Sequence, residues 1–99
     1  MDAELRSIIE KIKCIKPDLV ERYHLSQIAI FGSYARCEQT PESDLDIMVS
    51  FSVLPSLYEF LNLKEHLSEI LDKNVDLVIR EDLKPHIEQN ALAEKIDIP

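Results

Sequence analysis

Asp44 and Asp46 occupy alternate positions at the start of an apolar segment, Asp-Leu-Asp-Ile-Met-Val. Aspartate is disfavoured inside β-strands, so the pair calls for an explanation. Alternate residues of a strand face the same way and lie roughly 7 Å apart. Carboxylates at this spacing can converge on Mg²⁺, which is commonly held by one or two carboxylates and substrate phosphates. The alternative is that both aspartates simply line a solvated sheet face.

Asp76 is another aspartate inside an apolar segment that favours a strand, Asn74 to Ile79. It is predicted to be a third metal ligand or a general base near an incoming hydroxyl. Two Mg²⁺ ions about 3.5–4 Å apart would stabilise the attacking and leaving oxygens of an in-line phosphoryl displacement. The structural alternative is an ion pair with Arg80, two positions further along the same face.

Gly32, the only glycine of the chain, is followed directly by Ser33 at the end of an apolar segment. A residue without a side chain lets a phosphate approach the backbone, and the free amides of a first helical turn attract an anion. Ser33 would add one hydrogen bond, or would be an ordinary N-cap. Arg36 is a candidate phosphate contact or a structural ion-pair partner. Tyr34 either stacks on a base or packs half-buried.

The elements that must position these residues follow from the hydrophobic pattern. Helical spacing of apolar residues predicts a first helix up to Pro17, which is expected to interrupt it, and a second short helix from Pro17 to Tyr23. Residues 27–31 form a predicted strand, and residues 33–36 a predicted short helix. Residues 38–43 carry turn formers and no apolar residue, which indicates an exposed loop.

Asp44 to Phe51 is the next predicted strand, with its apolar face made by Leu45, Ile47 and Val49. A long helix opened by Pro55 and Ser56 follows, then a strand over residues 75–79 and a helix over residues 85–95. The inward stripe of the long helix is predicted to be Leu57, Phe60, Leu61, Leu67, Ile70 and Leu71. The last helix is predicted to turn Ile87, Ala91 and Leu92 inward. The order predicts a small sheet covered mainly on one face, with its last two strands parallel.

The length, charge and cysteine content limit the classes of function that this chain can have. Ninety-nine residues suit one domain, residues 1–99, with a single core. The formal net charge of −8 argues against nucleic acid as a direct partner and favours a basic protein. No apolar run approaches the roughly 20 residues of a membrane span, and the acidic N-terminus is unlike a signal peptide, so a cytoplasmic protein without membrane contact is expected. Cys14 and Cys37 form no disulfide or zinc pattern, and Cys14 is expected to fill core space.

Together, Gly32-Ser33-Tyr34-Ala35-Arg36, Asp44-Leu45-Asp46 and Asp76 resemble the minimal nucleotidyltransferases of the DNA polymerase beta superfamily. In particular the chain is similar to the MntA-like antitoxins, which are paired with HEPN-domain ribonuclease toxins. The similarity spans most of the chain, including the segment Val75 to Val78 and the helix after Pro85.

This resemblance implies an α+β fold, a small mixed β-sheet flanked by helices, like the polymerase beta palm. It implies that Asp44, Asp46 and Asp76 are catalytic and bind metal, with two Mg²⁺ ions. It implies that Gly32 and Ser33 form the turn that holds the nucleoside triphosphate, to which Arg36 is added as a candidate nucleotide-binding residue. The expected reaction moves AMP from ATP to a hydroxyl, a tyrosine of the HEPN toxin, and releases pyrophosphate.

Cys37 departs from the family pattern, which usually has glycine at that position. If the backbone there is left-handed, a non-glycine residue costs about 1–2 kcal/mol. This departure and the small size of the chain leave a second hypothesis, a non-catalytic module that neutralises a toxin by occlusion. A third is transfer to a small molecule, but the helical acceptor domain of such enzymes is missing from this sequence.

Overall fold

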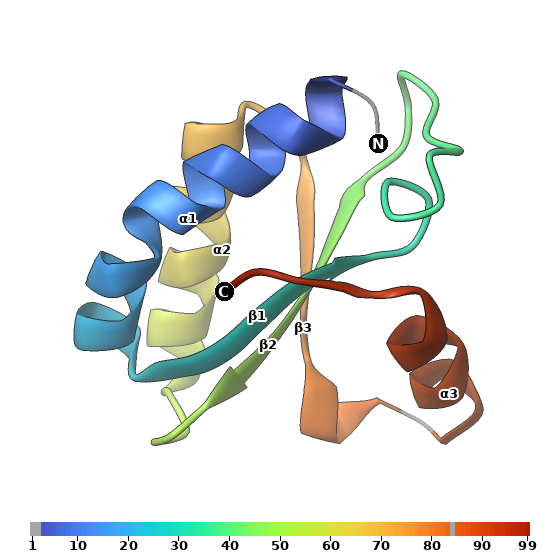
Figure 1. Cartoon of the computed structure of the whole chain (residues 1–99). Coiled ribbons are helices and arrows are strands. Elements are labelled where there is room, and N and C mark those ends of the chain that lie inside the picture. The colour runs from blue at the N-terminus through green and yellow to red at the C-terminus, as the bar shows by residue number, and fades with distance from the viewer. Residues whose placement is uncertain (1–2, 84) are drawn as a thin grey trace.

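The computed structural model describes residues 3–83 and 85–99, with the side chains of residues 85–88 and 90 left undescribed. The elements in chain order are α1 (Ala3–Tyr23), β1 (Leu25–Phe31), β2 (Leu45–Phe51), α2 (Leu57–Leu71), β3 (Val75–Ile79), the 3₁₀ turn η1 (Arg80–Asp82), α3 (Pro85–Glu94) and β4 (Ile96–Asp97). Helices α1 and α2 pack together on one side of the sheet, and α3 lies on the other side (Figure 1). The fold is therefore a small α+β domain, as expected.

The four strands form one mixed sheet in the order β3-β2-β1-β4. β1 pairs with β2 and with β4 in antiparallel fashion, whereas β2 and β3 are parallel. The parallel pairing follows from α2, because a long crossover helix returns the chain to the same end of the sheet. Its register sets Asp46 directly beside Asp76. Strand β4 was missed in the sequence because two residues carry no readable periodicity.

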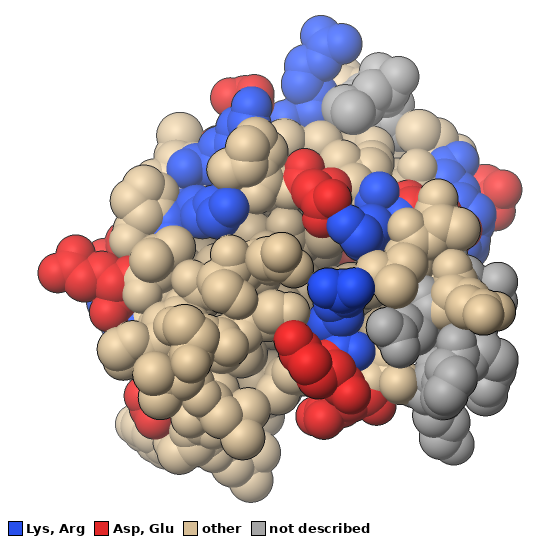
Figure 2. Space-filling model, turned by 60° about the horizontal axis from the view of Figure 1, so that its bottom comes forward, with Lys and Arg blue, Asp and Glu red and all other residues tan. Residues whose placement is uncertain are grey.

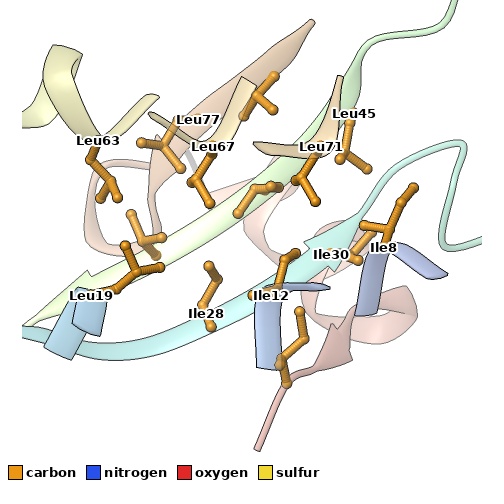
Figure 3. Packing of buried hydrophobic residues seen from close by; sticks show 14 of the residues in the cluster. Ile8, Ile12, Leu19, Ile28, Ile30, Leu45, Leu63, Leu67, Leu71 and Leu77 are labelled. Atoms are coloured by element: carbon orange, nitrogen blue, oxygen red, sulfur yellow. The ribbon is translucent and has the colours of Figure 1, made fainter. Parts of the chain in front are cut away.

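The core lies between the sheet and the α1–α2 layer. The β2 side chains Leu45, Ile47 and Val49 are almost fully buried, which confirms the predicted apolar face of that strand. Side chains from both helices meet strand residues in this core, as Figure 3 shows for Ile8, Ile12, Leu19, Ile28, Ile30, Leu63, Leu67 and Leu71. This packing holds β1, β2 and β3 rigidly, and it therefore fixes the residues at their ends.

The predicted break at Pro17 is wrong, because α1 continues through it from Ala3 to Tyr23. Proline removes one backbone donor and leaves the carbonyl of Lys13 without its helical partner. Pro17 and Lys13 are both exposed, so water can satisfy that carbonyl. Buried residues on both sides of Pro17, among them Ile12 and Leu19, keep the two halves on one core.

Other core predictions also failed. Cys14 is exposed and fills no core space. Leu57 and Leu61 of α2 are 74% and 50% exposed, because helical spacing sets them to the side of the buried stripe of Leu63, Leu67 and Leu71.

Other predicted core positions are confirmed. Leu67 and Leu71 are buried as predicted, as is Ala91 of α3, while Leu92 is half-buried. The prediction for Ile87 falls outside the described side chains.

Among the described residues, none of the helices has the length and apolar character needed to span a membrane.

Candidate active site

Asp46 and Asp76 face one another across the parallel β2–β3 pair. Their Cα atoms are register partners, so both side chains leave the sheet at the same level. Asp46 is half-buried and Asp76 is exposed, and their carboxyl groups come within hydrogen-bonding reach of each other. The alternative considered for Asp76, an ion pair with Arg80, is absent from the described residues.

The pKa of Asp46 is raised to about 6, first by burial and then by the neighbouring carboxylate of Asp76 and the more distant Asp44. Burial disfavours the ionised form, and a like charge nearby disfavours it further. A divalent cation relieves both effects at once, because it replaces lost hydration and neutralises the repulsion. The donor set, hard carboxylate oxygens, fits Mg²⁺.

Gly32 closes the site from the β1 side. Its φ of +74° is in the left-handed region, and an added Cβ would overlap Oδ2 of Asp46 and lie 3.0 Å from its Cγ. Only glycine combines that backbone conformation with so close an approach. Gly32, the sole glycine of the chain, is therefore in close contact with Asp46, the more buried acid of the pair.

Asp44, also predicted as a metal ligand, does not form a ready-made cage with Asp46 and Asp76. Asp44 lies just before β2, and its Oδ1 accepts a hydrogen bond of 2.8 Å from the Asn74 amide. Among the described residues, no three His, Cys, Asp or Glu side chains converge closely enough to hold a metal ion. Three carboxylates repel each other at close range, and Asn74 offers Asp44 a neutral donor instead. Sequence reasoning missed Asn74 because it reads as a turn residue.

The segment after Gly32 is a hydrogen-bonded turn, which corrects the predicted short helix over residues 33–36 and the N-cap role of Ser33. Glu38 N donates to Ser33 O at 2.9 Å, and Cys37 N donates to Tyr34 O at 3.2 Å. This is the pattern that ends helices with a left-handed residue, and Cys37 occupies that position with φ of 57°. The single turn ends at Cys37. The backbone there is left-handed, so the steric cost expected for a non-glycine residue at this position applies.

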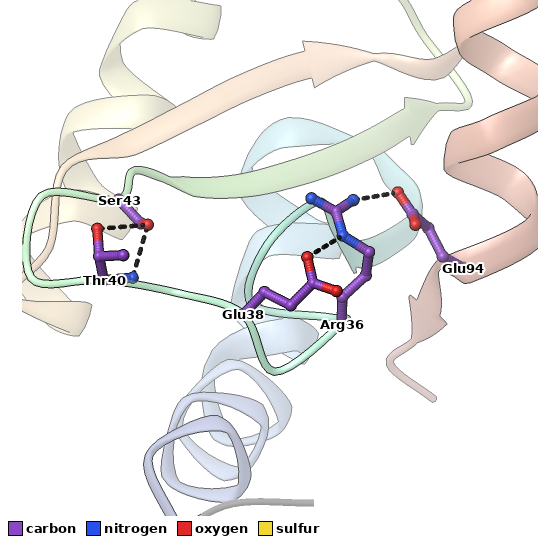
Figure 4. Close-up of polar contacts among 5 residues, drawn as sticks. All are labelled: Arg36, Glu38, Thr40, Ser43 and Glu94. Carbon is purple, nitrogen blue, oxygen red and sulfur yellow. Dashed lines mark hydrogen bonds and ion pairs between the residues drawn. The ribbon is translucent and has the colours of Figure 1, made fainter.

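Arg36 ties this turn to α3. Its Nε donates to Glu38 at 3.1 Å and its Nη1 to Glu94 at 2.8 Å, as Figure 4 shows. The same figure shows the Thr40–Ser43 turn, in which the Ser43 hydroxyl accepts from Thr40 N at 2.8 Å within the expected loop. Because these ion pairs are exposed to solvent they are weak, so a phosphate can displace the acidic partners of Arg36.

Tyr34 packs in the core and is only 4% exposed, so it offers no surface for stacking on a base. Lys73, which the sequence reading did not single out, lies 5.6 Å from the centre of its ring. Lys73 also pairs with Glu4 at 2.9 Å, and this hydrogen bond raises the pKa of the lysine. The positive charge of Lys73 therefore lies next to the turn that follows Gly32. Lys73 is brought there by tertiary contacts, which the sequence does not show.

A mixed sheet carries two facing acids on adjacent parallel strands, with a glycine turn against them, and this fold is that of the nucleotidyltransferases. Residues 10–98 match the family described as polymerase beta nucleotidyltransferase. The chain belongs to that family.

Two relatives cover most of the chain. A Methanocaldococcus jannaschii protein named as a candidate protein adenylyltransferase is 45% identical over 89 residues, which span 89% of this chain and 88% of the relative. The Thermococcus cleftensis protein adenylyltransferase MntA is 40% identical over 92 residues, which span 89% of this chain and 93% of the relative.

Solved structures agree with the fold. A candidate minimal nucleotidyltransferase superposes with a TM-score of 0.78 at 31% identity, covering 97% of this chain and 95% of that one. A chain from the Shewanella oneidensis complex of a tri-AMPylated HEPN toxin with its MNT antitoxin has a TM-score of 0.72 at 23% identity. It covers 96% of this chain and 71% of that one, and at this identity the likeness is one of fold.

Proposed function

We propose that this chain is a metal-dependent protein adenylyltransferase that acts as an antitoxin. It transfers AMP from ATP to a hydroxyl group, a tyrosine of a HEPN ribonuclease toxin, and so inactivates that partner. The single observation that carries the proposal is the Asp46–Asp76 pair with Gly32 against it. The adenylyltransferase relatives and the toxin–antitoxin likeness in fold support the choice of reaction and partner.

Each site residue has a proposed role. Asp46 and Asp76 would hold Mg²⁺, with Asp44 joining them by turning away from Asn74, with which it shares only an exposed hydrogen bond. Bound Mg²⁺ would neutralise the negative charge of the triphosphate during transfer. Gly32 and Ser33 would receive the phosphates along the backbone of the turn.

In the transfer step, the acceptor oxygen attacks the α-phosphorus of ATP as the bond to the bridging oxygen of the leaving pyrophosphate breaks. Asp76 is exposed beside Asp46 and is placed to take the proton of the attacking hydroxyl. Arg36 would contact the phosphates by exchanging Glu38 or Glu94 for a phosphate oxygen, since guanidinium groups bind carboxylate and phosphate with the same geometry. Most of the catalysis would come from positioning and charge neutralisation.

A protein acceptor fits the charge of the chain better than a nucleic acid. At −8, the surface would repel a phosphate backbone and attract a basic protein. The test is co-expression of a HEPN ribonuclease encoded beside this chain with wild type or Asp46→Ala, if the adjacent reading frame supplies one, followed by intact-mass measurement of that partner. Wild type should add one or more AMP units, and Asp46→Ala should slow transfer at least about a thousandfold, roughly 4 kcal/mol in the transition state.

Asp18→Ala is the matched control, because Asp18 is exposed on α1 and its ion-pair partner within the described structure is Arg22, four residues away. It should modify the partner at the wild-type rate. Near-normal transfer by Asp46→Ala would disprove the role of the acid pair. An unmodified but inhibited partner would disprove catalysis as the means of neutralisation.

The second candidate function is occlusion without chemistry, and one observation favours it. Exposed apolar side chains gather at the start of α2, where Leu54, Leu57 and Tyr58 are 74–78% exposed. Figure 2 shows a broad area without charged side chains at one side of the molecule. Leu57→Asp with Tyr58→Asp should abolish neutralisation while leaving the acid pair intact, if binding alone silences the partner.

A further inference from the structure

A second polar site lies on the sheet face opposite the α1–α2 layer. A pocket of about 210 Å³ is lined by Lys16 of α1, Gln27 of β1, Arg80 of η1, Lys95 and Asp97 of the C-terminal segment, with Ile28 and Ile98 beneath. We call these residues the basic pocket. Figure 2 shows Lys and Arg side chains spaced across the middle of one face of the molecule, with acidic side chains between them.

The basic pocket has a net positive charge, whereas the whole chain has a net negative charge. Among the described residues that line the pocket, Lys16, Arg80 and Lys95 face one carboxylate, Asp97, in a protein whose net charge is −8. Lys95 pairs with Asp97, while Lys16 donates to the carbonyl of Ile98 at 2.9 Å and keeps its charge uncompensated. Arg80 has no ion-pair partner among the described residues. Two positive charges are therefore left over at one place.

An unsatisfied buried hydroxyl adjoins these cations. Ser50 is only 6% exposed, and its Oγ has no hydrogen-bond partner within the described structure. Ser50 lines a cavity of about 10 Å³ together with Gln27, Arg80 and Lys95. That volume holds about one water molecule, which can link the hydroxyl to an anion in the basic pocket. A buried hydroxyl without a partner costs about 1–3 kcal/mol, so a ligand that satisfies it gains binding energy.

The strand register explains why these residues meet and how far they lie from the acid pair. Gln27 is the register partner of Ser50, and Arg80 directly follows Ile79, the partner of Val49. Ser50 and Asp46 face the same way on β2 but are four residues apart, roughly 13 Å along the strand. The basic pocket is therefore separate from the Asp46–Asp76 site, although both open on one sheet face.

We propose that the basic pocket binds a phosphate group, either inorganic phosphate or the phosphate of a nucleoside monophosphate. A phosphate monoester carries about −1.5 to −2 charges and three acceptor oxygens, which match the two excess positive charges and the donors of Arg80, Lys95, Gln27 and Ser50. A carboxylate would leave one charge and several donors unmatched. A phosphate held there lies on the same sheet face as the acid pair, roughly 13 Å from Asp46 along β2. The inference concerns binding and does not depend on the proposed transfer reaction.

The experiment is an NMR titration of the isolated, isotope-labelled chain without Mg²⁺, with inorganic phosphate in one series and AMP in the other. We expect saturable amide shifts at Ser50, Arg80 and Lys95. Equal affinities would show that phosphate alone is recognised, and tighter binding of AMP would show that the nucleoside also contributes. Shifts confined to the Gly32–Arg36 turn would overturn the proposal, as would shifts that never saturate.

Matched variants complete the test. Arg80→Gln with Lys95→Gln should weaken phosphate binding at least about tenfold, because each removes a charge-assisted hydrogen bond. Arg6→Gln with Lys11→Gln removes the same charge from exposed positions on α1 and should change the affinity less than about twofold. Ser50→Ala should weaken binding without lowering the urea midpoint. Equal losses in both double variants would show a general charge effect and would refute the basic pocket.

Discussion

Gly32 lies against Asp46 so closely that no Cβ fits between the turn and the carboxylate. The contact joins the end of β1 to the start of β2 at the point where these strands pair, since Phe31 is the register partner of Asp46. The backbone that would receive phosphate and the acid that would hold metal are therefore one packed unit.

Gly32→Ala should disrupt both parts of that unit. Alanine at φ of +74° costs about 1–2 kcal/mol, and its methyl group must also displace the Asp46 side chain. We expect the free energy of unfolding to fall by about 2 kcal/mol in urea denaturation, and transfer activity to fall at least about a hundredfold. Ser33→Ala, in the same turn, should lower stability by less than 1 kcal/mol. Equal stability of Gly32→Ala and wild type would contradict the close contact.

Cys37→Gly should stabilise the protein. Cys37 has φ of 57° at the left-handed position that ends the turn, where glycine avoids the steric cost of a side chain. The gain should be about 1 kcal/mol in the free energy of unfolding, seen as a higher urea midpoint. Cys37→Ala keeps the Cβ and should give no comparable gain. A loss of stability in Cys37→Gly would show that the cysteine side chain contributes more than its backbone costs.

Asp46→Asn should remove a pH dependence of stability. The folded-state pKa of Asp46 is about 6, above its ordinary value of 3.8, so the folded state binds this proton more tightly than the unfolded state. Its contribution to stability is thus greatest below pH 3.8 and is lost as pH rises towards and through 6. After allowing for solvent screening of a half-exposed group, wild type should lose about 1–2 kcal/mol relative to Asp46→Asn between pH 4 and pH 7. Parallel stability profiles for the two proteins would contradict the raised pKa.

Mg²⁺ should stabilise wild type and should fail to stabilise Asp46→Asn. A ligand that binds only the folded state adds about 1.4 kcal/mol at ten times its Kd, which thermal unfolding at pH 7.5 detects as a higher Tm. Asp76→Asn should also lose the effect, and Asp18→Asn should keep it. A wild-type shift that survives in Asp46→Asn would place the metal elsewhere.

Ser56→Ala tests the start of α2. The Ser56 hydroxyl accepts from Glu59 N at 3.1 Å, while the Glu59 side chain accepts from Ser56 N at 3.2 Å. Loss of such a reciprocal cap costs about 1 kcal/mol, which lowers the urea midpoint. Ser26→Ala, at an exposed β1 position, should change stability by less than about 0.5 kcal/mol.

The sequence predicts those elements whose formation depends on residues close together in the chain. Strands β1, β2 and β3 follow from short apolar runs, and Ser56 marks the start of α2 because its side chain caps the helix. The aspartates stand out because each conflicts with the strand propensity of its neighbours, and Gly32 stands out because it directly precedes Ser33 at the end of an apolar segment. Such conflicts are expected at functional sites, where a residue serves a purpose other than local stability.

Other features arose only from contacts between distant segments. α1 passes through Pro17 because burial on both sides outweighs one lost hydrogen bond, and Leu57 is exposed because the sheet packs against the stripe of Leu63, Leu67 and Leu71 instead. Asp44 turns to Asn74, and Arg80 and Lys95 meet beside Ser50, through strand pairings that no local pattern encodes.

The sequence by itself determined the types of residue available for chemistry and the elements that carry most of them, because propensity, capping and periodicity act over a few residues. Only the tertiary structure decided which of those residues meet. Strand register and burial depend on the whole chain, and they set Asp46 beside Asp76 while leaving Asp44 apart.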